Sequence, residues 1–118
     1  MNRKVVGYVR DSMGNNKNIQ KQIDEIINFV VTNFNVKKDE IDFFCDRTGT
    51  REERDGFEQM MEKVRQNQYD TLIVVHINRI YRIYGENKEK DMKKLNEIVD
   101  EIKKYDVDII SIREKQIV

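Results

Sequence analysis

The sequence contains a single cysteine, Cys45, no proline, and no apolar run long enough to span a membrane. A lone cysteine excludes a disulfide within the chain and favours an intracellular, cytoplasmic setting. The N-terminus has no signal-peptide core, because polar residues 2–4 lead directly into an apolar run. The composition therefore predicts neither secretion nor membrane insertion.

Charge of one sign is not in excess either, since 22 basic residues balance 22 acidic ones. Any contact with nucleic acid must then come from a local basic patch. The motifs GxxxxGK[ST] and GxGxxG are absent, which disfavours a nucleotide-triphosphate or dinucleotide fold. The length predicts one domain, residues 1–118, that buries roughly two thirds of its surface on folding.

Four apolar runs predict strands. Runs 3–10, 41–45 and 71–77 are typical of buried parallel strands, and 107–112 alternates more, as expected of a strand nearer an edge. Helical spacing of apolar residues fills the gaps at Ile19, Ile23, Ile26, Ile27 and Val30, at Phe57, Met60, Met61 and Val64, and at Met92, Leu95, Ile98, Val99 and Ile102. The order βαβαβαβ predicts an α/β fold, a mostly parallel central sheet of four to five strands with helices on both faces.

Arginines gather where the predicted strands end. Six of the nine follow the first three strands: Arg10, Arg47, Arg51, Arg54, Arg79 and Arg82. Sites in such sheets form beyond the carboxyl ends of the strands, and the guanidinium fork matches phosphate oxygens. The pattern therefore predicts a phosphate or phosphodiester site, although the run Arg51–Glu53 is also typical of a solvated surface.

One of only two serines, Ser12, lies at this predicted edge in the stretch GYVRDSMGNN at 7–16. A serine hydroxyl among arginines is suited to attack phosphorus while the guanidinium groups stabilise the developing charge. A turn or helix-capping role is the simpler alternative for a serine at such a position. His76 and Cys45 are isolated, so the sequence predicts no metal and no cofactor.

Several motifs resemble the serine site-specific recombinases, the resolvase/invertase family. YVRDS at 8–12 resembles the Y-x-R-x-S signature, and NIQKQI at 18–23 resembles the S-L-x-x-Q segment that follows it. DRTGTREERDGFEQMM at 46–61 resembles D-x-x-S-G…R-x-G-[FL], and YDTLIVVHINRIYR at 69–82 resembles the strand followed by D-R-L-x-R. With LNEIVDEIKKYDVDIISI, similar to the next helix and strand, the matches run in order over nearly the whole chain.

The resemblance implies a catalytic domain that breaks and rejoins DNA through a covalent 5′-phosphoserine link, without metal or high-energy cofactor. It implies DNA integration, resolution, inversion or transposition, in a mobile element such as a transposon, in a phage or in an inversion system. Carried over by position, Ser12 is the nucleophile, and Gln22 helps to order the site. The scissile phosphate would be held by Arg10, Arg54, Arg79 and Arg82. Further contacts at the substrate site fall on Tyr8, which we interpret as structural support, and on Arg47, Thr48, Arg51 and Asn78.

The chain differs from the family pattern at three places. Asn78 replaces the aspartate before Arg79, bulky Tyr81 follows Ile80 between two arginines, and Thr48 falls where the family has serine. The family's long dimerisation helix and DNA-binding domain have no counterpart in these residues. Full-length members form dimers and tetramers, whereas this chain is expected to be a monomer or weak dimer.

Two other functions stay open from the sequence. A degenerate, non-catalytic module that pairs with an active recombinase would explain the departures from the family pattern. A different phosphate enzyme on an α/β sheet, such as a small phosphatase, would also use the arginines. Tyr81 and Tyr84 either cover a loop or stack on bases.

Overall fold

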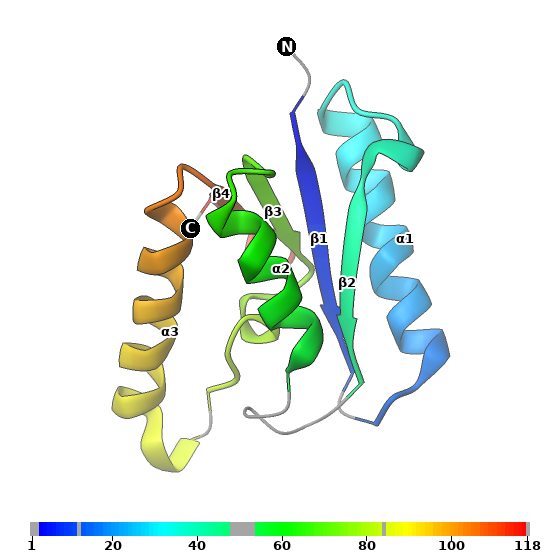
Figure 1. The fold of residues 1–118 in the computed structure, drawn as a ribbon. Coiled ribbons are helices and arrows are strands. Elements are labelled where there is room, and N and C mark those ends of the chain that lie inside the picture. The colour runs from blue at the N-terminus through cyan, green and yellow to red at the C-terminus, as the bar shows by residue number, and fades with distance from the viewer. Residues whose placement is uncertain (1–2, 12, 48–53, 84, 118) are drawn as a thin grey trace.

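A computed structural model describes residues 3–11, 13–47, 54–83 and 85–117, and a sheet of five strands forms its centre (Figure 1). The strands are β1 (Val5–Arg10), β2 (Asp42–Asp46), β3 (Thr71–Val74), β4 (Asp108–Ser111) and β5 (Gln116–Ile117). Their order across the sheet is β2-β1-β3-β4-β5. The first four run parallel, and β5 pairs antiparallel with β4.

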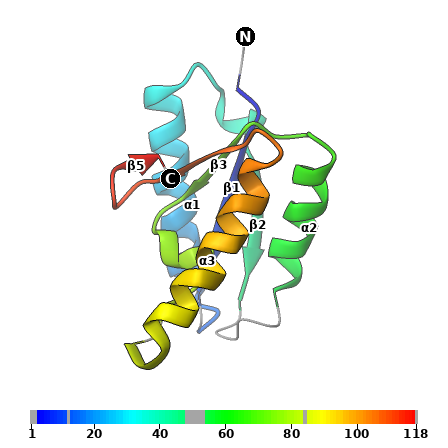
Figure 2. The same ribbon diagram turned by 90° about the vertical axis from the view of Figure 1, so that its left-hand side faces the viewer.

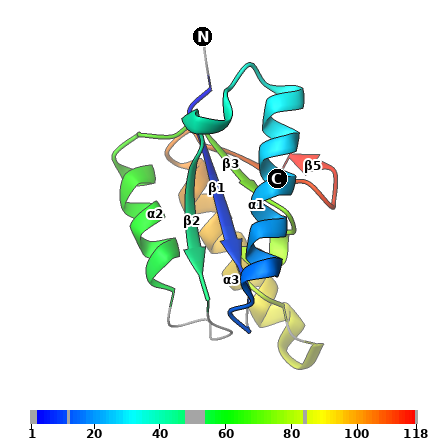
Figure 3. The ribbon, with the colours of Figure 1, turned by 90° about the vertical axis from the view of Figure 1, so that its right-hand side faces the viewer.

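Three α-helices cover the two faces of the sheet: α1 (Asn16–Asn33), α2 (Asp55–Arg65) and α3 (Lys88–Lys103). Figure 2 shows α2 and α3 in front of the sheet, and Figure 3 shows α1 on the opposite face. Short 3₁₀ turns η1 (Lys38–Glu40), η2 (Ile77–Arg79) and η3 (Gly85–Asn87) complete the elements. The predicted α/β fold with a mostly parallel sheet is confirmed.

Strand β1 is buried along its whole length because both of its faces are covered. Val5 and Val9 belong to the apolar cluster under α1, while Val6 and Tyr8 belong to the cluster under α2 and α3. Between them, Gly7 is required by close packing, since a Cβ at this position would lie 2.6 Å from the Phe43 ring of β2. The central strand is thereby fixed between two layers of helices.

Strand β2 is parallel as predicted, but the expectation that 41–45 is buried is wrong for most of it. β2 forms the sheet edge, with Asp42 exposed and residues 43–45 only half-buried. Segment 107–112, expected nearer an edge, is flanked by β3 and by the short β5, so Ile109 and Ile110 are buried. An apolar run predicts a strand, but it does not encode the position of that strand in the sheet or the extent of its burial.

The predicted apolar stripes face the sheet in all three helices, with one exception. Met92 is 37% exposed, whereas Leu95, Val99 and Ile102 are buried. The first turns of α3, the helix that carries Met92, extend past the end of the sheet (Figures 1 and 2). Within the described ranges, no helix combines the length and apolar character that crossing a membrane requires.

Candidate active site at the carboxyl end of the sheet

Arg10 is the last residue of β1 and lies almost completely inside the protein, with 2% of its surface exposed. Gln22 of α1 holds its main chain, because Gln22 Nε2 donates to the Arg10 carbonyl at 3.0 Å and Gln22 Oε1 accepts from the Arg10 N–H at 3.4 Å. The guanidinium donates from Nη2 to the main-chain oxygen of Asn78 at 3.2 Å. Within the described residues, its Nε and Nη1 have no hydrogen-bond partner.

Arg54 precedes α2 and is held by main-chain oxygens of the segment that follows β3. Its Nη2 donates to the Arg79 carbonyl at 2.8 Å, and its Nη1 donates to the Ile80 carbonyl. The guanidinium also lies over the Phe57 ring, 4.3 Å from its centroid, which is a cation–π contact. Arg54 is 6% exposed, and these contacts hold its guanidinium in one orientation.

Tyr8 joins Arg54 to an acidic residue at the end of β2. The Tyr8 hydroxyl donates to Asp46 Oδ2 at 2.6 Å and accepts from Arg54 Nε at 3.4 Å. Burial raises the pKa of Tyr8 well above its usual value, with a further contribution from Asp46, although the Arg54 charge opposes the shift. Tyr8 therefore stays a neutral phenol that supports the arginine from within the core.

Asp46 also caps helix α2. Its two carboxylate oxygens accept from the N–H groups of Gly56 at 2.8 Å and Phe57 at 3.0 Å. A side chain at position 56 could not fit, because a Cβ would lie 2.4 Å from the Cys45 carbonyl oxygen. Asp46, the last residue of β2, is thus hydrogen-bonded both to the start of α2 and to Tyr8.

Two arginines of the cluster, Arg10 and Arg79, have lowered pKa values, with burial as the largest cause. Burial lowers the pKa of Arg10, and the charges of Arg54, Arg79 and Arg82 add to this effect. Burial also lowers the pKa of half-buried Arg79, where Asp11 acts in the opposite direction. Guanidinium groups stay protonated in proteins, so the result is concentrated positive charge at this end of the sheet.

The structure brings many of the predicted site residues together. Arg10, Arg54 and Arg79 are linked through Tyr8, Gln22 and the main chain of Asn78. Exposed Arg82 lies close enough for its charge to act on both Arg10 and Arg79. Arg47 does not join them in the described contacts, because its Nη1 donates to Asn16 at the start of α1. Ser12, Thr48, Arg51 and Tyr84 lie outside the described residues.

Sequence reasoning missed the residues that support the arginines. Asp46 falls in the motif at 46–61, but the sequence indicates no role for it, and Phe57 is predicted only as part of a helical apolar stripe. No local capping signal could have identified Asp46, because it precedes Gly56 by 10 residues and reaches the start of α2 only through the fold. Tyr81 is half-buried and packs against the core cluster, which favours the interpretation that it covers a loop. No three His, Cys, Asp or Glu side chains gather in metal-binding geometry within the described part of the chain.

Fold and site together define a small α/β domain whose parallel strands end in a cluster of guanidinium groups. Residues 5–117 match the family model described as the resolvase N-terminal domain. This chain belongs to that family. No curated protein matches it significantly in sequence.

Three solved structures share the fold. The N-terminal catalytic domain of TP901-1 integrase has a TM-score of 0.73 and 22% identity, over 96% of this chain and 79% of that one. The C-terminal catalytic domain of ISC1926 TnpA, an IS607-like serine recombinase, has a TM-score of 0.72 and 17% identity, over 92% of this chain and 69% of that one. A serine recombinase from Sulfolobus solfataricus has a TM-score of 0.68 and 18% identity, over 93% of this chain and 68% of that one.

Proposed function

We propose that this chain is the catalytic domain of a serine site-specific DNA recombinase, and that it cleaves and rejoins DNA through a covalent 5′-phosphoserine intermediate. Ser12 is the nucleophile in this proposal. Residues 1–118 act as one catalytic unit in this proposal, and association on DNA to a dimer and then a tetramer belongs to the full-length protein. The recombination event belongs to integration, resolution, inversion or transposition.

One observation carries the proposal: Arg10 is 2% exposed, and in the described structure two of its guanidinium nitrogens have no partner. A buried charged donor without an acceptor is costly unless a ligand supplies one. The Nε of Arg79 is in the same condition. Non-bridging phosphate oxygens are acceptors with the matching charge and fork geometry. Family membership then identifies the phosphate as that of a DNA strand.

The reaction is a phosphoryl transfer in two balanced steps. The Ser12 Oγ attacks phosphorus, the bond from phosphorus to the 3′ oxygen breaks, and the 3′ oxygen leaves with a proton that came from the serine. The 5′ end of the broken strand stays attached to Ser12 as a phosphodiester. Attack by a 3′-hydroxyl on that linkage reverses the step, so the phosphoester bond is conserved and no ATP is consumed. Guanidinium groups stabilise the charge that develops on the phosphoryl oxygens.

The proposed roles follow from position. Arg10 and Arg79 face the phosphate with free donors, and Arg82 contributes charge from the exposed side. Arg54 is anchored to the turn that carries Arg79, since it bonds the carbonyls of residues 79 and 80. Further contacts to DNA are proposed for Arg47, Thr48 and Arg51. Gln22 orients the main chain of Arg10, Tyr8 orients Arg54, and Asn78 contributes its carbonyl oxygen.

The alternative of a non-catalytic module rests on Asn78, on Tyr81 and on the family's DNA-binding part having no counterpart in these residues, and the geometry bears on the first of these. Arg10 contacts residue 78 through the main-chain oxygen, which asparagine and aspartate supply equally. The substitution therefore leaves this described contact intact. We favour the catalytic function on this ground.

The test traps the covalent intermediate. The chain is fused to a DNA-binding domain of known site and incubated with DNA that carries two such sites around a nicked central segment. We expect a protein–DNA adduct that survives denaturing electrophoresis and is absent in Ser12→Ala. Met13→Ala is the matched control, because Met13 is the neighbouring residue and is 86% exposed.

Three outcomes would contradict the proposal. An adduct that persists in Ser12→Ala would exclude Ser12 as the nucleophile. If the wild-type fusion makes no adduct but co-purifies with a full-length recombinase, the non-catalytic module is the correct function. Turnover of a simple phosphoester would instead support the phosphatase alternative.

A further inference from the structure

The segment just after β3 determines where two of the guanidinium groups lie. Arg10 donates to the carbonyl of Asn78, and Arg54 donates to the carbonyls of Arg79 and Ile80. These contacts are to main-chain atoms. The position of this turn, η2 and the residue after it, therefore sets the position of both guanidinium groups, whatever side chains it carries.

Glu114, which lies between β4 and β5, holds the start of this turn. Its Oε1 accepts from the main-chain N–H of Ile77 at 2.7 Å and from the Ser111 hydroxyl at 2.8 Å. Ser111 is fully buried at the end of β4. One carboxylate oxygen thus ties the first residue of η2 to a rigid strand.

The same carboxylate lies 3.6 Å from the Nδ1 of His76, which itself accepts from the Asn78 N–H at 3.1 Å. Two consecutive anchors, Glu114 on Ile77 and His76 on Asn78, thus fix the first N–H groups of the turn. Burial alone would raise the pKa of Glu114. The bonds from Ile77 and Ser111 and the nearby His76 and Arg113 outweigh burial and lower it, so the carboxylate is ionised near neutral pH.

We propose that Glu114 is a positioning residue of the active site: through Ile77 it sets the turn whose carbonyls orient Arg10 and Arg54 toward the phosphate. The inference rests on the proposed function for its catalytic meaning. The structural link itself, from Glu114 to the two guanidinium groups, is independent of any activity.

The structural link is tested by NMR on the isotope-labelled chain, with the Ile77 amide and the side-chain Nε–H groups of Arg10 and Arg54 as reporters. We expect Glu114→Ala to shift all three signals and Glu114→Gln, which keeps an acceptor oxygen, to restore most of the wild-type positions. If Glu114→Ala fails to fold, Glu114→Asp is used, since it is one methylene too short to span Ile77 and Ser111. The inference is overturned if the Ile77 amide moves while both arginine signals stay in place.

Glu101 offers the matched control. Its Oε1 also accepts two hydrogen bonds, from Arg65 Nε at 3.1 Å and Nη2 at 2.9 Å, but on the exposed faces of α2 and α3. Glu101→Ala should leave the Ile77, Arg10 and Arg54 signals unchanged. A shift of the arginine signals in this control equal to that in Glu114→Ala would also overturn the inference.

The catalytic consequence is measured in the trapping assay. We expect Glu114→Ala to slow adduct formation by about 10- to 100-fold, as a misplaced catalytic group does, with unchanged DNA affinity and recovery in Glu114→Gln. An unchanged rate in Glu114→Ala would overturn the positioning role. Absence of any adduct in the wild type would overturn the proposed function, and the NMR result would still decide whether Glu114 orients the arginines.

Discussion

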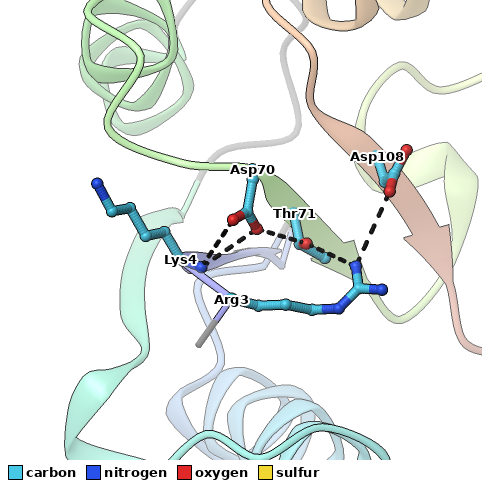
Figure 4. A network of polar contacts seen from close by, with 5 residues as sticks. All are labelled: Arg3, Lys4, Asp70, Thr71 and Asp108. Carbon is cyan, nitrogen blue, oxygen red and sulfur yellow. Dashed lines mark hydrogen bonds and ion pairs between the residues drawn. The ribbon is translucent and has the colours of Figure 1, made fainter. Parts of the chain in front are cut away.

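Both ends of the sheet carry arginines, but the partners and the burial of these arginines differ between the two ends. At the amino end, Arg3 donates to the Thr71 hydroxyl at 3.2 Å and lies 3.8 Å from the Asp108 carboxylate (Figure 4). Asp70 accepts from the Lys4 N–H and from Thr71 in the same network. The charged groups of Arg3, Asp70 and Asp108 each have an opposite charge or a hydrogen-bond partner beside them, and all three residues are exposed to solvent.

The carboxyl end is built the other way. Arg10 and Arg54 are buried and bond to main-chain carbonyls in the described structure, while Asp46 is engaged by Tyr8 and by the start of α2. Asp11 is engaged by α1 as well, since it accepts from the Asn15 N–H at 2.7 Å. Balanced charges at the amino end have their partners within the fold, whereas the surplus buried donors at the carboxyl end fit the phosphate ligand that we propose.

The largest expected difference between the ends is in activity. Arg10→Met should slow adduct formation by about 100- to 1,000-fold, because it removes donors to the developing charge. The free energy of unfolding should change by less than about 1 kcal/mol or rise, since a buried charge without a carboxylate partner is removed. The trapping assay and urea denaturation measure the two effects.

Arg3→Met is the control at the amino end. We expect an adduct rate within about twofold of wild type, because a partly exposed ion pair far from the phosphate contributes little. Equal losses of activity from the two substitutions would contradict the division of roles between the ends.

For the aspartates, the difference between the two ends should appear in stability, with the larger loss at the carboxyl end. Asp46→Ala should lower the free energy of unfolding by about 3 kcal/mol, because it leaves the Tyr8 hydroxyl and two N–H groups of α2 without their buried acceptor. Asp70→Ala should cost about 1 kcal/mol or less, since its bonds to Lys4 are exposed. Urea denaturation of both variants checks this, and a larger loss from Asp70→Ala would be the contrary result.

Acid should weaken the carboxyl end through Glu114. Its folded-state pKa lies below the ordinary value of 4.5, so its contribution to stability is present above that pH. The contribution is lost as the pH falls through the folded-state pKa. The difference in unfolding free energy between wild type and Glu114→Gln should therefore be constant above pH 4.5 and shrink below it. A difference that does not vary over this acidic range would contradict the assignment.

The smallest effect is expected for the ion pair at the amino end. Asp108→Ala should change the free energy of unfolding by about 0.5 kcal/mol or less, because both partners are solvated, with side-chain exposures of 44% for Arg3 and 65% for Asp108. The effect should vanish at about 1 M salt, where screening is strong. A double-mutant cycle with Arg3→Met measures the coupling free energy of the pair. A coupling that persists at high salt would contradict the expectation that solvent and salt screen this interaction.

Local patterns predicted the elements well. The stripes Phe57–Val64 and Leu95–Ile102 bury against the sheet as their spacing indicates, because helical periodicity requires no knowledge of distant residues. The third strand was predicted to reach residue 77 but ends at Val74. The difference arises because His76 and Glu114 capture the N–H groups of residues 78 and 77 and fold the chain into η2.

The sequence by itself determined that this chain makes a helix-covered parallel sheet and that its arginines follow the strand ends, since both follow from local period and position. Only the tertiary structure decided that Arg10 keeps free buried donors while Arg47 bonds Asn16. It alone brought Glu114 to Ile77, 37 residues away. The physical reason is that strand order and loop paths decide which distant polar groups meet, and no local pattern of apolar residues contains that information.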